Sequence, residues 1–553
     1  MKTNRNIVHR ILSGLSLTGV ATAAALVGCS DLAAPCREGN CLVTDGSSAS
    51  TAGSGGAGST SGSGSSAGGN GAGSGGHGEG GAGGEAPTPS CDPELANDPV
   101  ADSCGIFVST SLGTDSAQGQ GTKALPFATL AKALDVLSTT GITTLYLCGE
   151  TFEEAVVMPS GVNVYGGLEC TKGWQKGSGT KSVIQGPADT IALRIVGGGS
   201  SVIRALRVKA ADAKTAGASS IAMMVTDAGI DLEGVELIAG LPAKGATGVD
   251  AAGTGKDGIL GIAGKGGCVN ATTVVSDPGP SLTCDGGDSE GGMGGVGVNG
   301  NAAAGTAGSS TPSVTNENGG SGQQSTAGST CSNGKPGLEG APGTPGEGAV
   351  GIGTIGGPSG YDGVSGGPGK SYGRPGQGGG GGGGASGKLA CTTTTNAGPS
   401  GGSGGTGGCG GKPGTGGQAG GSSIALVALN AKLTLANSVL SAKDGAAGGS
   451  GSGGQLGGSG FAGGAFGMGN KSHACSGGSG GNGGRGGAGG GGLGGHSLAV
   501  AYLGMAPTID EASVTTTIAA GGLGGLGGFG GTGNVGGVGA NGLAQKVFAF
   551  DPL

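Results

Sequence analysis

A two-strand pattern that recurs at separated places constrains this chain more than any other feature. The stretch SIAMMVTDAGIDLEGVELIAG, 220–240, aligns without a gap with SIALVALNAKLTLANSVLSAK, 423–443, and that stretch aligns with SLAVAYLGMAPTIDEASVTTT from residue 497. Upstream, IALRIV from Ile191 and IRALRVKA from Ile203 match the two halves of the first stretch. Each copy holds two runs with apolar residues at alternate positions, which is the period of a β-strand.

No copy can close a hydrophobic core alone, so each must stack on its neighbour. A unit of roughly 22 to 30 residues suits one coil of a parallel β-helix. The predicted fold class is therefore all-β. Four apolar residues at equivalent positions would then stack in successive coils: Ile191, Ile221, Ile424 and Leu498. The alternative is a β-sandwich whose strand pairs resemble one another by chance.

The first 28 residues have the pattern of a targeting segment. Three basic residues precede an uncharged apolar run at 11–27. The run ends in Leu-Val-Gly-Cys at 26–29, which resembles the lipobox of bacterial lipoproteins. The resemblance implies cleavage before Cys29 and acylation of its thiol and amine, and more than one acyl chain anchors a protein stably. An ordinary secretory signal with an accidental cysteine is the alternative. No other apolar run is long enough to cross a bilayer.

A linker and a cap follow the targeting segment. Residues 46–85 are nearly all Gly, Ser and Ala, and such a chain of forty residues is a flexible coil with a span of roughly 35 Å. The stretch 107–137 resembles the capping segment of many bacterial right-handed β-helix proteins, with a P-F-x-T-L-x-x-A-L motif from Pro126. The resemblance implies a capping strand and helix, and it says little about function because this superfold hosts many activities. Four apolar residues would form one helix face: Leu130, Ala133, Leu134 and Leu137.

Glycine supplies 146 of the 553 residues, and it is concentrated in separate segments. Three of these segments begin just after a copy of the repeat, so we expect all three to leave one corner of the coil. Within the first, GKPGLEGAPGTPGEG at 334–348 has a collagen-like period but too few triplets for a triple helix, and it indicates local polyproline-II structure. Whether the glycine-rich segments pack together or remain disordered stays open at this point.

The expected organisation follows from these boundaries. It comprises a signal peptide (1–28), a lipid-anchored linker (29–90), the cap and first coils (91–240), a glycine-rich insertion (241–421), a coil (422–444), a second insertion (445–496), a coil (497–520), a third insertion (521–542) and a terminal strand (543–553).

Thirteen cysteines are present, and acylation of Cys29 would leave twelve. An even number outside the cytoplasm favours disulfides. The expected local pairs are Cys36–Cys41, Cys91–Cys104, Cys148–Cys170 and Cys268–Cys284. Three connectivities are open for the remaining four, which are Cys331, Cys391, Cys409 and Cys475. Metal ligation is the weaker alternative, because the chain has no C-x-x-C motif and only four histidines.

Charged residues favour a structural role over catalysis. Arg204 aligns with Glu233, and Arg207 aligns with Glu236, so strands ~4.8 Å apart would place each arginine beside its glutamate. His473 and His496 have no carboxylate partner nearby in the sequence. The sequence thus indicates no catalytic residue, no metal site and no cofactor.

Composition limits the partners. The formal net charge is −8, and loss of the three basic residues of the targeting segment gives −8 − 3 = −11. An acidic chain without a basic stripe is a poor ligand for nucleic acid, and 3% aromatic residues argue against a sugar-stacking cleft. We therefore expect a non-enzymatic lipoprotein tethered to the outer membrane or surface of a bacterial cell, acting as spacer, matrix component or adhesin. The alternative is a β-helix protein that binds or degrades polysaccharide.

Overall fold

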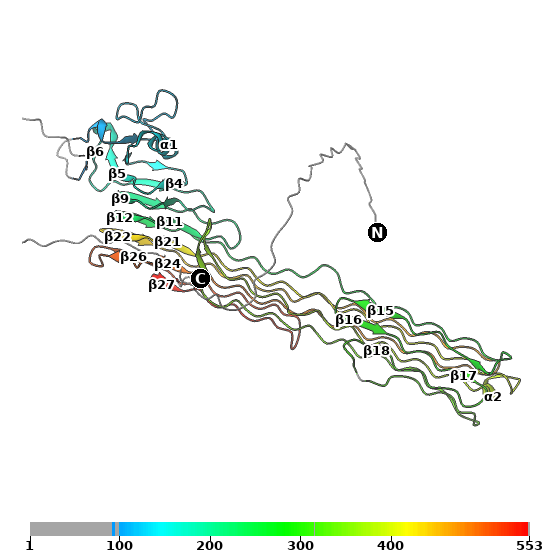
Figure 1. Ribbon diagram of the computed structural model, residues 1–553. Coiled ribbons are helices and arrows are strands. Elements are labelled where there is room, and N and C mark those ends of the chain that lie inside the picture. The colour runs from blue at the N-terminus through cyan, green and yellow to red at the C-terminus, as the bar shows by residue number, and fades with distance from the viewer. Residues whose placement is uncertain (1–90, 95–98, 315, 551–553) are drawn as a thin grey trace, which may run out of the picture. The chain divides into compact units, whose positions relative to one another are not determined.

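The computed structural model describes residues 91–94, 99–314 and 316–550 (Figure 1). All of them belong to the compact unit Glu85–Leu553, which is distinct from the unit Met1–Gly84. The predicted signal peptide, Cys29, the Cys36–Cys41 pair and the linker lie outside the described residues.

Three large sheets with mostly parallel pairing dominate the described chain. Sheet A contains β1 (Ile106–Val108), β2 (Thr144–Cys148), β5 (Asn163–Glu169), β9 (Ser200–Arg204), β12 (Gly229–Glu233), β22 (Lys432–Ala436) and β25 (Thr508–Ile509), and β6 (Gln175–Lys176) pairs antiparallel with β5. Sheet B contains β3 (Thr151–Phe152), β7 (Ser182–Gln185), β10 (Leu206–Lys209), β13 (Glu236–Ile238), β23 (Val439–Ser441) and β26 (Thr515–Thr517). Sheet C contains β4 (Val156–Pro159), β8 (Leu193–Val196), β11 (Ser220–Thr226), β21 (Ser423–Leu429), β24 (Ser497–Leu503) and β27 (Ala544–Ala549).

The chain visits these sheets in a fixed order. From β2 to β27, with the exception of β6, the successive strands of the three sheets belong to A, B and C in turn, and from β5 onward each pairs in parallel with the strand one circuit earlier. The predicted all-β class is therefore confirmed. Side chains from all three sheets meet in one buried cluster, including Leu145 of sheet A, Leu206 of sheet B and Ile195 of sheet C.

A helix covers the first circuits. Helix α1 (Leu130–Thr140) buries Leu130, Ala133 and Leu137 in the cluster shared by the sheets, and Leu134 packs against it partly buried. The Thr129 side chain accepts a hydrogen bond from the Lys132 amide at the start of the helix. Gly141 ends the helix with φ 73°, a left-handed conformation that suits glycine.

The repeat copies pair in the register of the sequence alignment. Ile221 pairs with Ile424, which pairs with Leu498, and Leu193, two residues after Ile191, pairs with Met223. All four aligned residues belong to a second apolar cluster, separate from the one that the three sheets share. The hairpin of β19 (Thr354–Gly356) and β20 (Gly360–Asp362), which comes from the first glycine-rich insertion, contributes Ile355 and Tyr361 to that cluster.

All three glycine-rich insertions connect sheet B to sheet C, after β13, β23 and β26. Their residues form a glycine bundle, by which we mean the hydrogen-bonded segments within 243–421, 445–495 and 521–542 (Figure 1). Short elements interrupt the first insertion: β14 (Thr273–Val274) with β17 (Gly297–Val298), β15 (Ser281–Cys284) with β16 (Gly287–Glu290) and β18 (Ser309–Ser310), and α2 (Gly387–Ala390). The 3₁₀ turns Asp102–Cys104 and Cys170–Lys172 complete the list of elements.

Hydrogen bonds in the bundle recur at every third residue. The amides of Gly258, Gly261 and Gly264 donate to the carbonyls of Ser459, Ala462 and Ala465. Polyproline II has three residues per turn and makes no internal hydrogen bonds, so every third group points at the same neighbour. The three-residue period therefore indicates polyproline-II geometry across the bundle, beyond the local stretch at 334–348, and of the two alternatives left open the segments are packed.

The run of seven glycines at 378–384 is buried throughout. Its seven amides and seven carbonyls all have hydrogen-bond partners. These partners lie in six segments: 292–295, 303–309, 318–323, 332–338, 399–405 and 475–481. A side chain has no room here, since a Cβ at Gly381 would lie 1.9 Å from the Met293 carbonyl oxygen.

Five disulfides join described cysteines. The sheet region holds Cys91–Cys104 and Cys148–Cys170, as expected. In the bundle, the expected Cys268–Cys284 pair is wrong. The structure joins Cys268 to Cys391, Cys284 to Cys409 and Cys331 to Cys475. Cysteines near in sequence lie at different positions along extended segments, so their partners come from neighbouring segments instead.

Candidate functional site

A column of side chains runs along one face of sheet A. Phe107 pairs with Tyr146, Tyr146 with Tyr165, and Tyr165 with Arg204, one strand after another. The rings of Phe107 and Tyr146 stack at 4.9 Å, those of Tyr146 and Tyr165 stack at 5.7 Å, and Trp174 packs edge-on against Phe107. Tyr146 is fully buried, and burial raises the pKa of its hydroxyl, which donates to the Cys91 carbonyl. The aromatic part of the column is thus a packed interior beneath the Cys91–Cys104 segment.

Arg204 continues this column as the centre of a charge cluster. Its NH1 atom lies 2.8 Å from an Asp92 carboxylate oxygen. Its Nε lies 3.0 Å from Glu233, a charge contact without an aligned hydrogen bond. Arg207 Nε lies 2.5 Å from Glu236 Oε2, and Lys181 Nζ lies 3.9 Å from the other oxygen of Glu236. The structure therefore brings both aligned Arg–Glu pairs together, across adjacent strands.

A cavity of about 230 Å³ opens beside this cluster. Its lining includes Lys181, Arg204 and Glu233, together with Glu94 and Lys176, which form an ion pair of their own. Because its carboxylates are engaged by cations, the cavity offers charge and hydrogen bonds to a polar ligand. It offers no nucleophile beside a free base.

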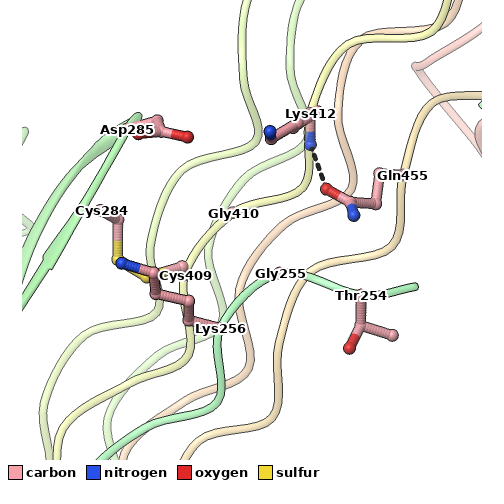
Figure 2. A pocket seen from close by; sticks show the side chains of 9 residues that line it. All are labelled: Thr254, Gly255, Lys256, Cys284, Asp285, Cys409, Gly410, Lys412 and Gln455. Atoms are coloured by element: carbon pink, nitrogen blue, oxygen red, sulfur yellow. Dashed lines mark hydrogen bonds between the residues drawn. A yellow bond between two sulfur atoms is a disulfide. The ribbon is translucent and has the colours of Figure 1, made fainter. Parts of the chain in front are cut away.

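A second cavity, of about 280 Å³, lies in the glycine bundle at the Cys284–Cys409 disulfide (Figure 2). Lys256, Lys412 and Asp285 line it, and the Lys412 amide donates to the Gln455 side chain at 3.0 Å. All three charged side chains are exposed to solvent. The positive charges that the cavity offers to an anion are therefore two solvent-exposed amines, beside the Thr254 hydroxyl and the Gln455 amide.

His496 is fully buried. Its Nδ1 accepts a hydrogen bond from the Leu543 amide at 2.8 Å, so its Nε2 carries the proton and donates to the Ile352 carbonyl at 2.7 Å. The imidazole contacts the rings of Tyr361 and Phe550 edge-on. Burial lowers the pKa of His496, and the hydrogen bond to Ile352 offsets only part of this effect. The geometry joins the first insertion, the end of the second insertion and the terminal segment that begins at residue 543, rather than presenting a base to a substrate.

We expect acidification to destabilise this junction. Unfolded histidine has a pKa near 6.5, and the folded pKa of His496 is lower, so the unfolded chain binds more protons between the two values. Unfolding free energy should therefore fall as pH drops below about 6.5, by at most about 1.4 kcal/mol per pH unit, until the folded pKa is passed. Denaturant unfolding of the native chain and of His496→Gln at several pH values checks this.

A matched control is His473→Gln. The His473 ring stacks on Phe466 at 4.1 Å, and the residue is exposed to solvent. The decrease in unfolding free energy as pH drops below about 6.5 should persist in His473→Gln and disappear in His496→Gln. A slope that His496→Gln leaves intact would assign the effect to other groups.

Other sequence-derived candidates have structural partners. Within the described ranges, no group of three or more His, Cys, Asp and Glu residues is placed to hold a metal ion.

Sequence reasoning missed the Ile355–Tyr361 hairpin and its contact with His496. The run Gly-Gly-Pro-Ser-Gly at 356–360 was a local turn signal for that hairpin, and it is weak in a chain so rich in glycine.

Comparison with known proteins gives no relative: no family model, no curated protein and no solved structure matches the chain. Among the described residues, no helix has the length and apolar character to cross a membrane.

Proposed function

We propose that this chain is a structural lipoprotein of the bacterial cell envelope. In this proposal the three sheets form a right-handed parallel β-helix with an N-terminal cap, and the glycine bundle projects from it as a spacer, matrix component or adhesin. The observation that carries the proposal is the seven-glycine run, whose fourteen backbone groups are all bonded to neighbouring segments. A bundle bonded in this way resists bending, which suits a part that spans distance or bears load.

The proposed anchor is Cys29. Acyl chains on this residue would tether the sheets and the bundle through the Gly/Ser-rich linker. The proposal places the chain on the outer membrane or cell surface, with matrix or surface components as partners.

We expect the chain expressed in a bacterium to fractionate with membranes and to carry acyl groups on its first residue after processing. Mass spectrometry of the N-terminal peptide and membrane fractionation measure this. Cys29→Ser should remove the acyl mass and leave the apolar segment at 11–27 attached, and proteolysis of intact cells should degrade the native chain. A soluble native chain with an unmodified Cys29 would contradict the anchor.

A polysaccharide-binding or polysaccharide-degrading protein is the second candidate. The cavity beside Arg204 favours it, because it joins cationic and carboxylate side chains on the face of a parallel sheet. Incubating the chain with acidic polysaccharides separates the two candidates. Reproducible release of unsaturated products, lost in Arg204→Ala, would favour the enzyme.

A further inference from the structure

The third insertion carries an exposed apolar surface. Residues 521–530 and 534–542 run side by side, since the amides of Gly536, Gly539 and Gly542 donate to the carbonyls of Gly528, Gly525 and Gly522. Their outward side chains form what we call the hairpin patch. It consists of Leu523, Leu526, Phe529, Val535 and Val538, which are 68%, 66%, 70%, 50% and 62% exposed.

The patch has a regular relief. Leu523, Leu526 and Phe529 stand three residues apart, so they recur every ~9.3 Å along a polyproline-II segment. Val538 and Val535 repeat the spacing on the adjacent segment, and Phe529 bridges to Val535. Two glycines lie between successive members of the row Leu523, Leu526 and Phe529. Each of these side chains therefore forms a ridge, and the ridges alternate with grooves that have no side chains.

The hairpin itself carries no charged side chain. No charged residue occurs between Glu511 and Lys546, in a chain whose formal net charge is −8. The exposed Glu347 lies on the adjacent segment, whose residues 346 and 349 accept hydrogen bonds from Gly537 and Ala540, so charge borders the patch without entering its two rows. An apolar surface therefore fits the rows themselves.

We propose that the hairpin patch is a self-association surface on which a second copy of this chain docks through the same patch. Two copies in antiparallel orientation present ridges of identical spacing, so the ridges of one enter the grooves of the other. Such an isologous contact closes as a dimer. Head-to-tail stacking of the sheets is disfavoured, because helix α1 covers the first circuits.

Side chains rather than strand edges make this contact. Strand β27 is an edge strand of sheet C, and it carries the exposed Lys546. Lysine on an edge strand discourages pairing with another strand. The five patch side chains expose roughly 500 Å² per copy at about 150 Å² for each large side chain. This area is below the ~800 Å² per partner of a standard interface, so the dimer is a weak one.

Sedimentation equilibrium of the purified chain carrying Cys29→Ser tests the proposal. This variant cannot be acylated, so the result is independent of the proposed anchor. We expect a monomer–dimer equilibrium at micromolar concentrations. Leu526→Asp should raise the dissociation constant at least tenfold. The matched control Leu260→Asp alters another exposed leucine, in a segment bonded to 459–462, and should leave it unchanged.

Cysteine crosslinking gives a second readout. Leu526 lies at the middle of its row, so Leu526→Cys should form disulfide-linked dimers under oxidation, whereas Leu260→Cys should not. A chain that stays monomeric up to about 100 µM would overturn the proposal. So would equal weakening by both aspartate variants, or a monomer whose patch instead binds phosphatidylcholine vesicles.

Discussion

Replacing Gly381 by alanine should destabilise the glycine bundle by about 3 kcal/mol or more. A Cβ at this position would lie 1.9 Å from the Met293 carbonyl oxygen and 2.5 Å from its carbon. Backbone cannot move aside as a flexible side chain does. The adjacent segments must therefore separate, and the hydrogen bonds from Gly381 to Thr306 and from Gly320 to Gly381 are lost or weakened. Overpacking of this kind costs about 1–3 kcal/mol in ordinary cores, and the backbone of the bundle has less freedom to relax.

Hydrogen exchange of the peptide that contains 378–384 measures this effect, together with the midpoint of thermal unfolding. The matched control is Gly300→Ala, in the same insertion, because a Cβ there meets nothing within 4 Å. We expect that control to change stability by no more than about 0.5 kcal/mol. Equal protection of the 378–384 amides in both variants would show that the run is not enclosed.

Removing the Cys284–Cys409 disulfide should cost about 4 kcal/mol. The two cysteines are 125 residues apart, but the Cys268–Cys391 disulfide already joins this loop, so the bond closes (284 − 268) + (409 − 391) = 34 residues of the unfolded chain. The double variant Cys284→Ser/Cys409→Ser should therefore unfold at a clearly lower denaturant concentration than the native chain.

Removing Cys91–Cys104 provides the comparison. This bond closes only 13 residues, so its loss should cost about 3 kcal/mol. Peptide mapping without reduction checks the connectivity itself, because it should recover Cys268 joined to Cys391. Recovery of Cys268 joined to Cys284 would contradict the arrangement of the bundle.

Register in the sheet region was predictable because the repeat signal lies in side chains. Alternating apolar residues around Ile221 and Ile424 must face the same surroundings, so the alignment of the copies is also the alignment of their strands. The Arg204–Glu233 and Arg207–Glu236 contacts follow from the same register. The P-F-x-T-L motif likewise predicted a helix, which the structure places at Leu130–Thr140.

The arrangement of the bundle was not predictable, because glycine carries no information about its neighbours. The sequence of 378–384 does not indicate which six segments surround it. One regularity does continue from the repeat copies into the bundle. Residues that bond to one another past Gly240 are still separated by 202 to 204 positions, close to the offset between the first two copies. Thus the Gln455 side chain donates to the Ala252 carbonyl, and the Gly454 amide donates to Asp250. The repeat therefore extends into the glycine-rich segments with its side chains replaced by backbone contacts.

The sequence predicted the stacked residues of the second apolar cluster but not the residues that cover them, for a related reason. The residues that cover Ile221 and Ile424 are Ile355 and Tyr361, which lie within a glycine-rich insertion. His496 showed no carboxylate neighbour in the sequence, and its actual partners are the backbone groups of Ile352 and Leu543. Backbone partners leave no trace in composition or spacing.

The three-residue repeat of hydrogen bonds also determines how such a chain can change length during evolution. Adding or deleting one or two residues in a segment would rotate every later amide away from its acceptor. Adding three residues restores the phase and lengthens the segment by ~9.3 Å. The bundle can therefore grow or shrink in triplets, provided that bonded neighbours change together. Insertion lengths in related chains should differ mostly by multiples of three. Natural variation would then change the length of the bundle in discrete steps, while the sheets keep their register.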